Sequence, residues 1–128
     1  MNLTVLDSSA VLAVLLDEPG ANVVNALDAS QKVISSVNFE EVRTKLIDRG
    51  MTPEDALQAI GKLQLRIEVF AVGDAVMAST LRPSTRQFGL SLGDRACLAL
   101  GQKLNAVVMT SDQTWKKVDL PVRVELIR

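Results

Sequence analysis

Short apolar runs alternate along the chain with longer segments whose apolar residues recur at helical spacing. The runs that read as strands cover residues 3–6, 32–35, 66–71, 106–110 and 122–127. The segments that read as helices cover residues 8–16, 21–27, 38–50, 53–64, 74–81, 91–103 and 113–118. Strands that alternate with helices pair in parallel. The pattern therefore predicts an α/β sandwich with a central, mostly parallel sheet of about five strands and helices on both faces.

Local signals mark several of the predicted helix boundaries. Thr52 is a favourable N-cap, and Pro53 after it suits the first helical position. Ser91 is a candidate cap for the helix that follows it. Residues 83–89 are polar and begin with a proline, so they are predicted to form a loop. We find no repeat, low-complexity stretch or linker, and a chain of 128 residues is expected to form one domain, residues 1–128.

Composition narrows the partners and the cellular setting. The chain is 48% hydrophobic but only 3% aromatic, so its core must be aliphatic. The surplus of aliphatic residues indicates surface buried in a dimer or against a partner. A net charge of −1 makes no general case for nucleic-acid binding, which would have to depend on local basic patches. The one cysteine, Cys97, fits a reducing cytoplasm and reads as a small core residue. Neither a signal peptide nor a membrane span is expected.

The chain contains no histidine. A histidine-based acid–base ribonuclease, a Ser-His-Asp hydrolase and most zinc enzymes are thereby excluded. Any chemistry must come from carboxylates, hydroxyls, basic side chains or a metal ion.

Four acidic residues stand where strand-like runs give way to helical ones. They are Asp7, Glu41, Asp94 and Asp112. Sites in open α/β sheets form at the carboxyl ends of the strands, so the four side chains are expected to converge there. A cluster of like charges repels itself unless it holds a cation. With oxygen ligands and no histidine, that cation would be Mg²⁺ or Mn²⁺.

Each acid also has a purely structural explanation. Asp7 and Asp112 can act as N-caps, and Glu41 would lie in the first turn of its helix, where a negative charge is favourable. Periodicity does not choose between Glu41 and Glu40. Asp94 suits a capping box with Ser91.

The helical position of Asp94 argues against a structural role alone. It shares a helix face with Cys97, Leu98 and Gly101, and a carboxylate on a buried face is costly unless something pairs with it. A bound metal ion would meet that requirement.

Together, these motifs resemble a PIN-domain protein of the VapC toxin type. The matching segments are Asp7-Ser8-Ser9-Ala10, Glu18-Pro19-Gly20-Ala21, Asn38-x-x-Glu41-Val42, Gly89-Leu90-Ser91-Leu92-Gly93-Asp94-Arg95-Ala96 and Thr110-Ser111-Asp112-x-x-Trp115. They occur in order over essentially the whole chain. Ser111 and Gly93 are departures or variable choices within the motifs, and neither removes a carboxylate.

The resemblance implies a PIN-like α/β/α fold and a Mg²⁺- or Mn²⁺-dependent endoribonuclease, the toxin of a type II toxin–antitoxin pair. By the family pattern Asp7, Glu41, Asp94 and Asp112 hold the metal, and the Asn-x-x-Glu spacing selects Glu41 over Glu40. The hydroxyls of Ser9 and Thr110 can support these ligands. A cognate antitoxin and a homodimer are likewise implied. Hydrolysis by a metal-bound water is expected to leave a 5′-phosphate and a 3′-hydroxyl.

An acidic site repels RNA, so basic residues must surround it. Arg86 and Arg95 are the preferred phosphate contacts. Other candidates are Arg43, Lys45, Arg49, Arg82, Lys116 and Lys117. Trp115 could stack on a base but reads more simply as a core residue.

The alternative function is a metal-free α/β interaction module in which the acids serve as caps and surface charges. Phosphotransfer folds that begin with an Asp after the first strand fit less well. Haloacid dehalogenases need a second Asp where Ser9 stands, and receiver domains usually have an acidic pair where Asp7 has no acidic neighbour.

Overall fold

The computed structural model describes residues 2–128 and has a five-stranded sheet at its centre. The strands are β1 (Thr4–Leu6), β2 (Lys32–Ser35), β3 (Arg66–Glu68), β4 (Val107–Thr110) and β5 (Val124–Leu126). Their order is β3-β2-β1-β4-β5, and every neighbouring pair is parallel. The predicted α/β class and number of strands are therefore confirmed.

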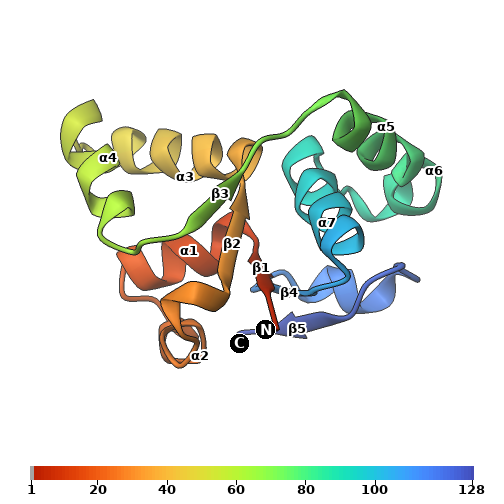
Figure 1. Cartoon of the computed structure of the whole chain (residues 1–128), viewed down its shortest axis with the longest axis horizontal. Helices are drawn as coiled ribbons and strands as arrows, with labels where there is room; N and C mark the ends of the chain where they lie inside the picture. The colour runs from red at the N-terminus through yellow and green to blue at the C-terminus, as the bar shows by residue number, and fades with distance from the viewer. Residues whose placement is uncertain (1) are drawn as a thin grey trace.

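Helices cover both faces of this sheet (Figure 1). One side carries α1 (Ser8–Leu15), α2 (Ala21–Asn25), α3 (Ser36–Asp48) and α4 (Pro53–Gly61). The other side carries α5 (Val72–Thr80), α6 (Arg82–Thr85) and α7 (Leu92–Leu104). Short 3₁₀ helices occur at η1 (Ala29–Gln31), η2 (Arg86–Phe88) and η3 (Gln113–Lys117). No helix within residues 2–128 is long and apolar enough to cross a membrane.

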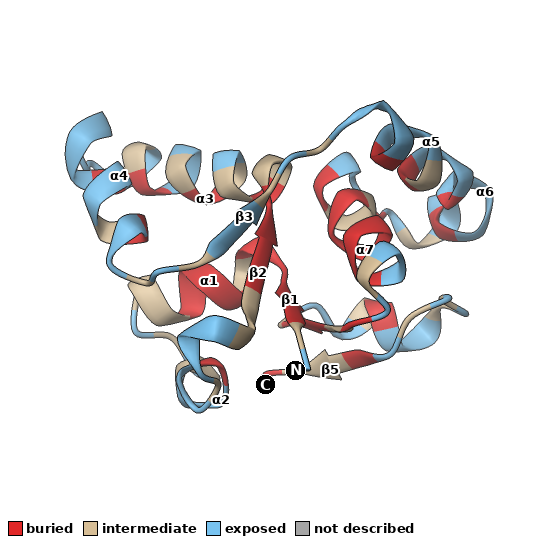
Figure 2. Cartoon of the chain, viewed as in Figure 1, coloured by how far each residue is buried: buried red, intermediate tan, exposed pale blue. Residues whose placement is uncertain are grey.

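The two faces of the sheet build two separate cores. Successive strand residues point to opposite faces, so Val5 and Val33 join the core beneath α7, whereas Leu6 and Ile34 join the core beneath α1 and α3. The central strands β1 and β2 and much of helix α7 are buried, while α2 and α4 expose most of their outer surface (Figure 2). Helices on both faces explain why the central strands are continuous apolar runs.

The strand order positions the candidate site. From β1 the chain moves to β2 and β3 on one side, and later returns to β4 on the other side of β1. The direction of the strand order therefore switches between β1 and β4, and in open α/β sheets ligands bind outside the carboxyl ends of the strands at such a switch point. Asp7 directly follows β1, and Asp112 is the second residue after β4, so both lie at this point.

The prediction of a loop over residues 83–89 was wrong. Helix α6 and 3₁₀ helix η2 occupy most of it, because Pro83 lies in the first turn of α6, where no backbone N–H is needed. Thr85 is fully buried, and its hydroxyl donates to Leu81 O at 2.8 Å. Gly89, with φ of 71°, then ends the segment.

Other boundaries moved by a few residues. Helix α3 begins at Ser36 rather than at Asn38, because Ser35 is its N-cap and accepts a hydrogen bond from Val37 N. Helix α4 ends at Gly61 and β3 at Glu68, both earlier than predicted. The edge strands pair on one side only, which shortens β3 and β5 relative to their apolar patterns.

Candidate functional site

Asp7 is a buried carboxylate at the switch point. It occupies the N-cap position of α1 but makes no side-chain capping hydrogen bond to that helix, so the capping explanation fails for it. Its side chain instead accepts two hydrogen bonds at Oδ2, from Ser9 Oγ at 2.8 Å and from Thr110 Oγ1 at 2.9 Å. The residue is only 5% exposed.

The two hydroxyls that bind Asp7 also tie the neighbouring strand to it. Ser9 Oγ accepts from Ser111 N at 3.0 Å, and Thr110 Oγ1 accepts from Asp112 N at 3.1 Å. Residues after β1 and after β4 are thereby locked together across about a hundred positions of sequence. Ser9 and Thr110 lie where the sequence placed them, in contact with a predicted ligand.

Burial and charge raise the pKa of Asp7 to about 6. Desolvation is the larger cause, and the negative charge of Asp94 adds to it, while the Ser9 and Thr110 hydrogen bonds oppose the shift. A carboxylate in this setting gains from any nearby cation.

Glu41 is held by side chains of two helices, α1 and its own helix α3. Its Oε1 accepts from Ser8 Oγ at 2.5 Å and from Asn38 Nδ2 at 2.9 Å. The fully buried Asn38 also donates to Gly93 O at 3.0 Å, which joins α3 to the first turn of α7. Glu40 is exposed and bonds to Thr44 instead, so the structure directs Glu41 and not Glu40 toward the other acids.

Gly93 allows Glu41 to approach α7. A Cβ atom placed on Gly93 would overlap the Glu41 carboxylate, including Oε2. The sequence alone gave Gly93 no role at the site, whereas the structure shows that the lack of a side chain there makes room for Glu41. Because the contact joins residues 52 positions apart, local sequence gives no sign of it.

Asp94 has both roles that the sequence left open. Its Oδ2 accepts from Ser91 N at 2.8 Å, and its own N–H donates to Ser91 Oγ at 3.2 Å, which completes a capping box. Burial raises its pKa, as do the charges of Asp112 and Glu41, while the Ser91 hydrogen bonds lower it. The acids of four separate segments therefore act on one another electrostatically.

Asp112 is the exposed member of the group. Its Oδ1 accepts from Thr114 N at 2.9 Å and caps η3, as the structural explanation predicted. Its charge still reaches Asp94. It is therefore both a cap and part of the acidic group.

Cys97 lies beneath the acids and is fully buried. Burial raises the pKa of its thiol well above the usual range, and the charges of Asp7, Asp94 and Glu41 raise it further. The thiol stays protonated, which agrees with a core residue and not a nucleophile. Trp115 is 1% exposed, so it too packs in the core.

The donors at this edge fit a hard divalent cation. They are carboxylate and hydroxyl oxygens, and the buried Asn38 Oδ1 has no hydrogen-bond partner among the described residues. As the side chains stand, no three acids of residues 2–128 are drawn together closely enough to hold an ion. A cation would have to draw Glu41, Asp94 and Asp112 inward against the repulsion that raises their neighbours' pKa values.

The two arginines predicted to contact RNA differ in exposure and in their hydrogen bonds to the protein. Arg86 is exposed in η2. Arg95 is half-buried, and its Nη1 donates to Ala78 O at 3.2 Å, which uses part of the guanidinium within the fold. Their contact with RNA stays a prediction.

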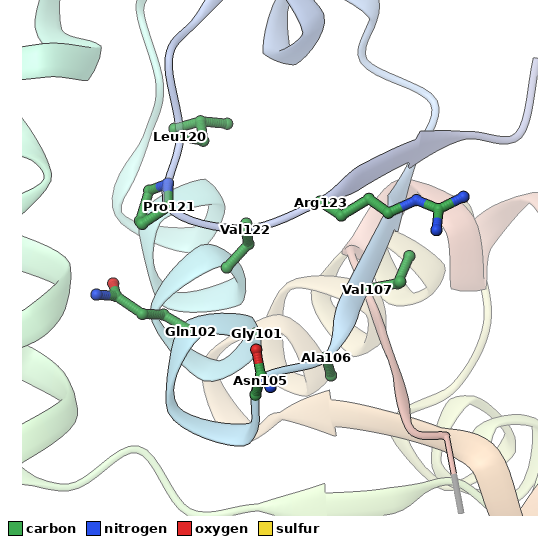
Figure 3. Close-up of a pocket in the computed structure, with 9 residues that line it drawn as sticks. All are labelled: Gly101, Gln102, Asn105, Ala106, Val107, Leu120, Pro121, Val122 and Arg123. Atoms are coloured by element: carbon green, nitrogen blue, oxygen red, sulfur yellow. The ribbon is translucent and has the colours of Figure 1, made fainter.

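A cavity of about 440 Å³ lies at the other end of the sheet, away from the acids (Figure 3). The end of α7 and the start of β4 supply Gly101, Asn105 and Val107, and the segment before β5 supplies Val122 and Arg123. It contains no acidic side chain. The volume of this cavity is therefore no sign that the chemistry takes place there.

Comparison with known proteins places this arrangement in a family. The family model described as the PIN domain matches residues 4–120. No curated protein sequence matches the chain.

Solved structures share the fold at low sequence identity. A chain of the DNA-bound VapBC complex from Salmonella typhimurium is 17% identical with a TM-score of 0.79, and each chain covers 100% of the other. VapBC2 from Rickettsia felis, bound to a DNA fragment from its promoter, is 17% identical with a TM-score of 0.75 and coverage of 97% and 98%. VapBC-5 from Mycobacterium tuberculosis is 20% identical with a TM-score of 0.63 and coverage of 100% and 99%.

Proposed function

The chain belongs to the PIN-domain family, and from that membership we propose that it is a Mg²⁺- or Mn²⁺-dependent endoribonuclease that acts as the toxin of a toxin–antitoxin pair. PIN domains are generally nucleases, and they generally use divalent metals. The observation that carries the proposal is the buried Asp7 carboxylate, held by Ser9 and Thr110 at the carboxyl ends of β1 and β4, with acids from three other segments close to one another around it. The charge of Asp94 raises the pKa of Asp7, and the charges of Asp112 and Glu41 raise that of Asp94.

Four residues would hold the ion, namely Asp7, Glu41, Asp94 and Asp112. Their supports are already in place. Ser9 and Thr110 fix the Asp7 carboxylate, and Ser8 and Asn38 fix Glu41. Partners of this kind orient metal ligands and raise their affinity.

A divalent ion supplies Lewis acidity that activates water and neutralises charge on the phosphate. The chain's own contribution is to hold that ion beside a dry core on one side and solvent on the other. Asp7 is buried, whereas Asp112 is exposed and lies toward incoming RNA. Asn38 Oδ1 has no partner in the described chain, so it can accept a hydrogen bond from a donor such as water.

An antitoxin and a second copy of the chain are the expected protein partners. VapBC and FitAB complexes are among the structures that share the fold. Exposed apolar side chains just after β3 and on α5 offer surface for such contacts, including Val69 at 74%, Val72 at 81% and Val76 at 60% exposure.

The decisive experiment combines metal binding and RNA cleavage. Titration calorimetry with MnCl₂ is expected to show binding that Asp7→Asn weakens by at least about 100-fold, more than removal of a supporting residue would cause. The same substitution is expected to abolish cleavage of total RNA. Asp119→Asn changes an exposed acid outside the group and serves as the matched control.

The metal-free interaction module predicts the opposite result. In that case Mn²⁺ binding would not depend on Asp7, and Asp94→Asn would not affect any cleavage. A 2′-deoxy nucleotide at the scissile position tests the chemistry separately. Hydrolysis by activated water tolerates it, whereas complete loss of cleavage with binding retained would show attack by the 2′-hydroxyl.

A further inference from the structure

A second hollow adjoins the acidic group on the α1 and α3 side. It has a volume of about 210 Å³ and is lined by Ser9, Leu12 and Leu16 from α1 and its C-cap, by Lys45 and Arg49 from α3 and its C-cap, and by Glu18 and Arg128. Ser9 belongs to both places, because its hydroxyl donates to Asp7 Oδ2. The hollow is therefore continuous with the candidate site.

The charges in this hollow are unevenly paired. Glu18 lies 3.9 Å from Arg128, whose Nη1 also donates to Pro19 O at 2.7 Å. In residues 2–128, neither Lys45 nor Arg49 forms an ion pair, and neither side chain donates a hydrogen bond to the protein. Two exposed cations are left without a protein partner beside a strongly acidic site.

Helical spacing aligns these cations with the metal-site glutamate. Glu41 and Lys45 are four residues apart in α3, so they lie on one helix face, and Arg49, the C-cap of α3, follows four residues after Lys45. At 1.5 Å per residue, Lys45 stands about 6 Å and Arg49 about 12 Å along the helix from Glu41. The result is a row of positive charge that leads away from the acids.

We propose that Lys45 and Arg49 bind successive backbone phosphates of a single-stranded RNA on one side of the scissile bond. The proposal rests on the nuclease function proposed above and adds the path by which the strand leaves the site. An acidic group repels RNA, so affinity must come from phosphate contacts beside it.

The test is RNA binding measured by fluorescence anisotropy. All proteins carry Asp7→Asn, so that the strand is not cut, and the probe is a labelled oligouridylate of about ten nucleotides. Lys45→Gln with Arg49→Gln is expected to weaken binding about tenfold or more. Because each lost phosphate contact reduces the salt slope of a single strand by about 0.7, the slope should fall by about 1.4.

A matched control and a rescue separate a local effect from a general one. Lys32→Gln with Lys62→Gln removes the same charge elsewhere and is expected to leave binding unchanged. Lys45→Arg with Arg49→Lys keeps the charges and is expected to restore binding. The proposal is overturned if the control loses as much affinity for RNA, or if Lys45→Gln with Arg49→Gln (the pocket variant) leaves that affinity unchanged. The second outcome would leave the hollow to a protein segment.

Failure here can be told apart from failure of the nuclease assignment. If the chain with Asp7 intact cuts RNA but the pocket variant binds RNA normally, the enzyme stands and the pocket proposal falls. If the pocket variant loses RNA binding but no protein cuts RNA, the nuclease assignment falls and the binding site stands.

Discussion

Two glycines on helix α7 face opposite ends of the sheet, and their surroundings differ in kind. At the carboxyl end, Gly93 lies against the Glu41 carboxylate, the far end of a flexible side chain. At the amino end, Gly101 lies against Val108, a fully buried branched side chain of β4. A Cβ atom at either position would overlap its neighbour.

Gly93 leaves room for a carboxylate of the candidate site, whereas Gly101 leaves room for α7 to pack closely against β4. The carboxyl end concentrates buried polar groups joined by hydrogen bonds, whereas the cavity near Gly101 contains no acid (Figure 3). Substitutions at the two ends should therefore change different measurements.

Of the two glycine substitutions, Gly93→Ala should have the larger effect on metal binding. The new methyl group would push the Glu41 carboxylate away from the other acids, at little cost to folding because that side chain can rotate. Mn²⁺ affinity and cleavage are expected to fall about 10–100-fold, with the melting temperature nearly unchanged. Gly61→Ala, whose new methyl group would meet nothing, is the control. Unchanged Mn²⁺ affinity would show that Glu41 does not bind the metal.

Gly101→Ala should mainly affect stability. Val108 is stiff and enclosed, so overpacking is expected to lower the free energy of unfolding by about 1–3 kcal/mol, measured by urea denaturation. Mn²⁺ affinity of the folded protein should stay the same. Gly73→Ala, on an exposed part of α5, provides the comparison. A loss of metal affinity here would mean that the two ends are coupled.

A smaller effect is expected from pH in the metal-free protein. The pKa of Asp7 is about 6 when folded, above its ordinary value of 3.8, so the folded state keeps a proton that the unfolded chain has lost. Stability should therefore rise by about 1 kcal/mol as pH falls from about 7 to about 5, and level off below about 4. It is lost again as pH rises through 6.

Urea denaturation in a metal chelator measures this dependence. Asp7→Asn should reduce it, whereas Gly101→Ala should lower stability equally at each pH and keep the dependence. If Asp7→Asn retains the full pH response, another group is responsible for it.

Local sequence was sufficient wherever a feature depends on near neighbours. Thr52 and Ser91 cap their helices as predicted, because each bonds to a backbone N–H three residues ahead. The alternation of apolar runs and helical segments was sufficient to predict the parallel sheet. The loop over residues 83–89 failed because Pro83 can begin a helix as readily as it ends one.

The site divides in the same way. The positions of Asp7 and Asp112 after their strands follow from the apolar pattern, and so does the buried face of Asp94. The Asn38 network and the exclusion of a side chain at Gly93 do not, since they join residues 30 to 55 positions apart. No local propensity reports such contacts.

By itself the sequence determined the class of fold and the four acids at strand and helix junctions, and the absence of histidine leads us to expect a cation that prefers oxygen ligands. Only the tertiary structure decided how these acids are held, Asp7 by hydroxyls from two segments and Glu41 by side chains of α1 and α3, and it placed Lys45 and Arg49 beside them. The physical reason is that strand and helix formation depends on neighbours a few residues away. Burial, charge repulsion and close approach depend on which distant segments the sheet brings together.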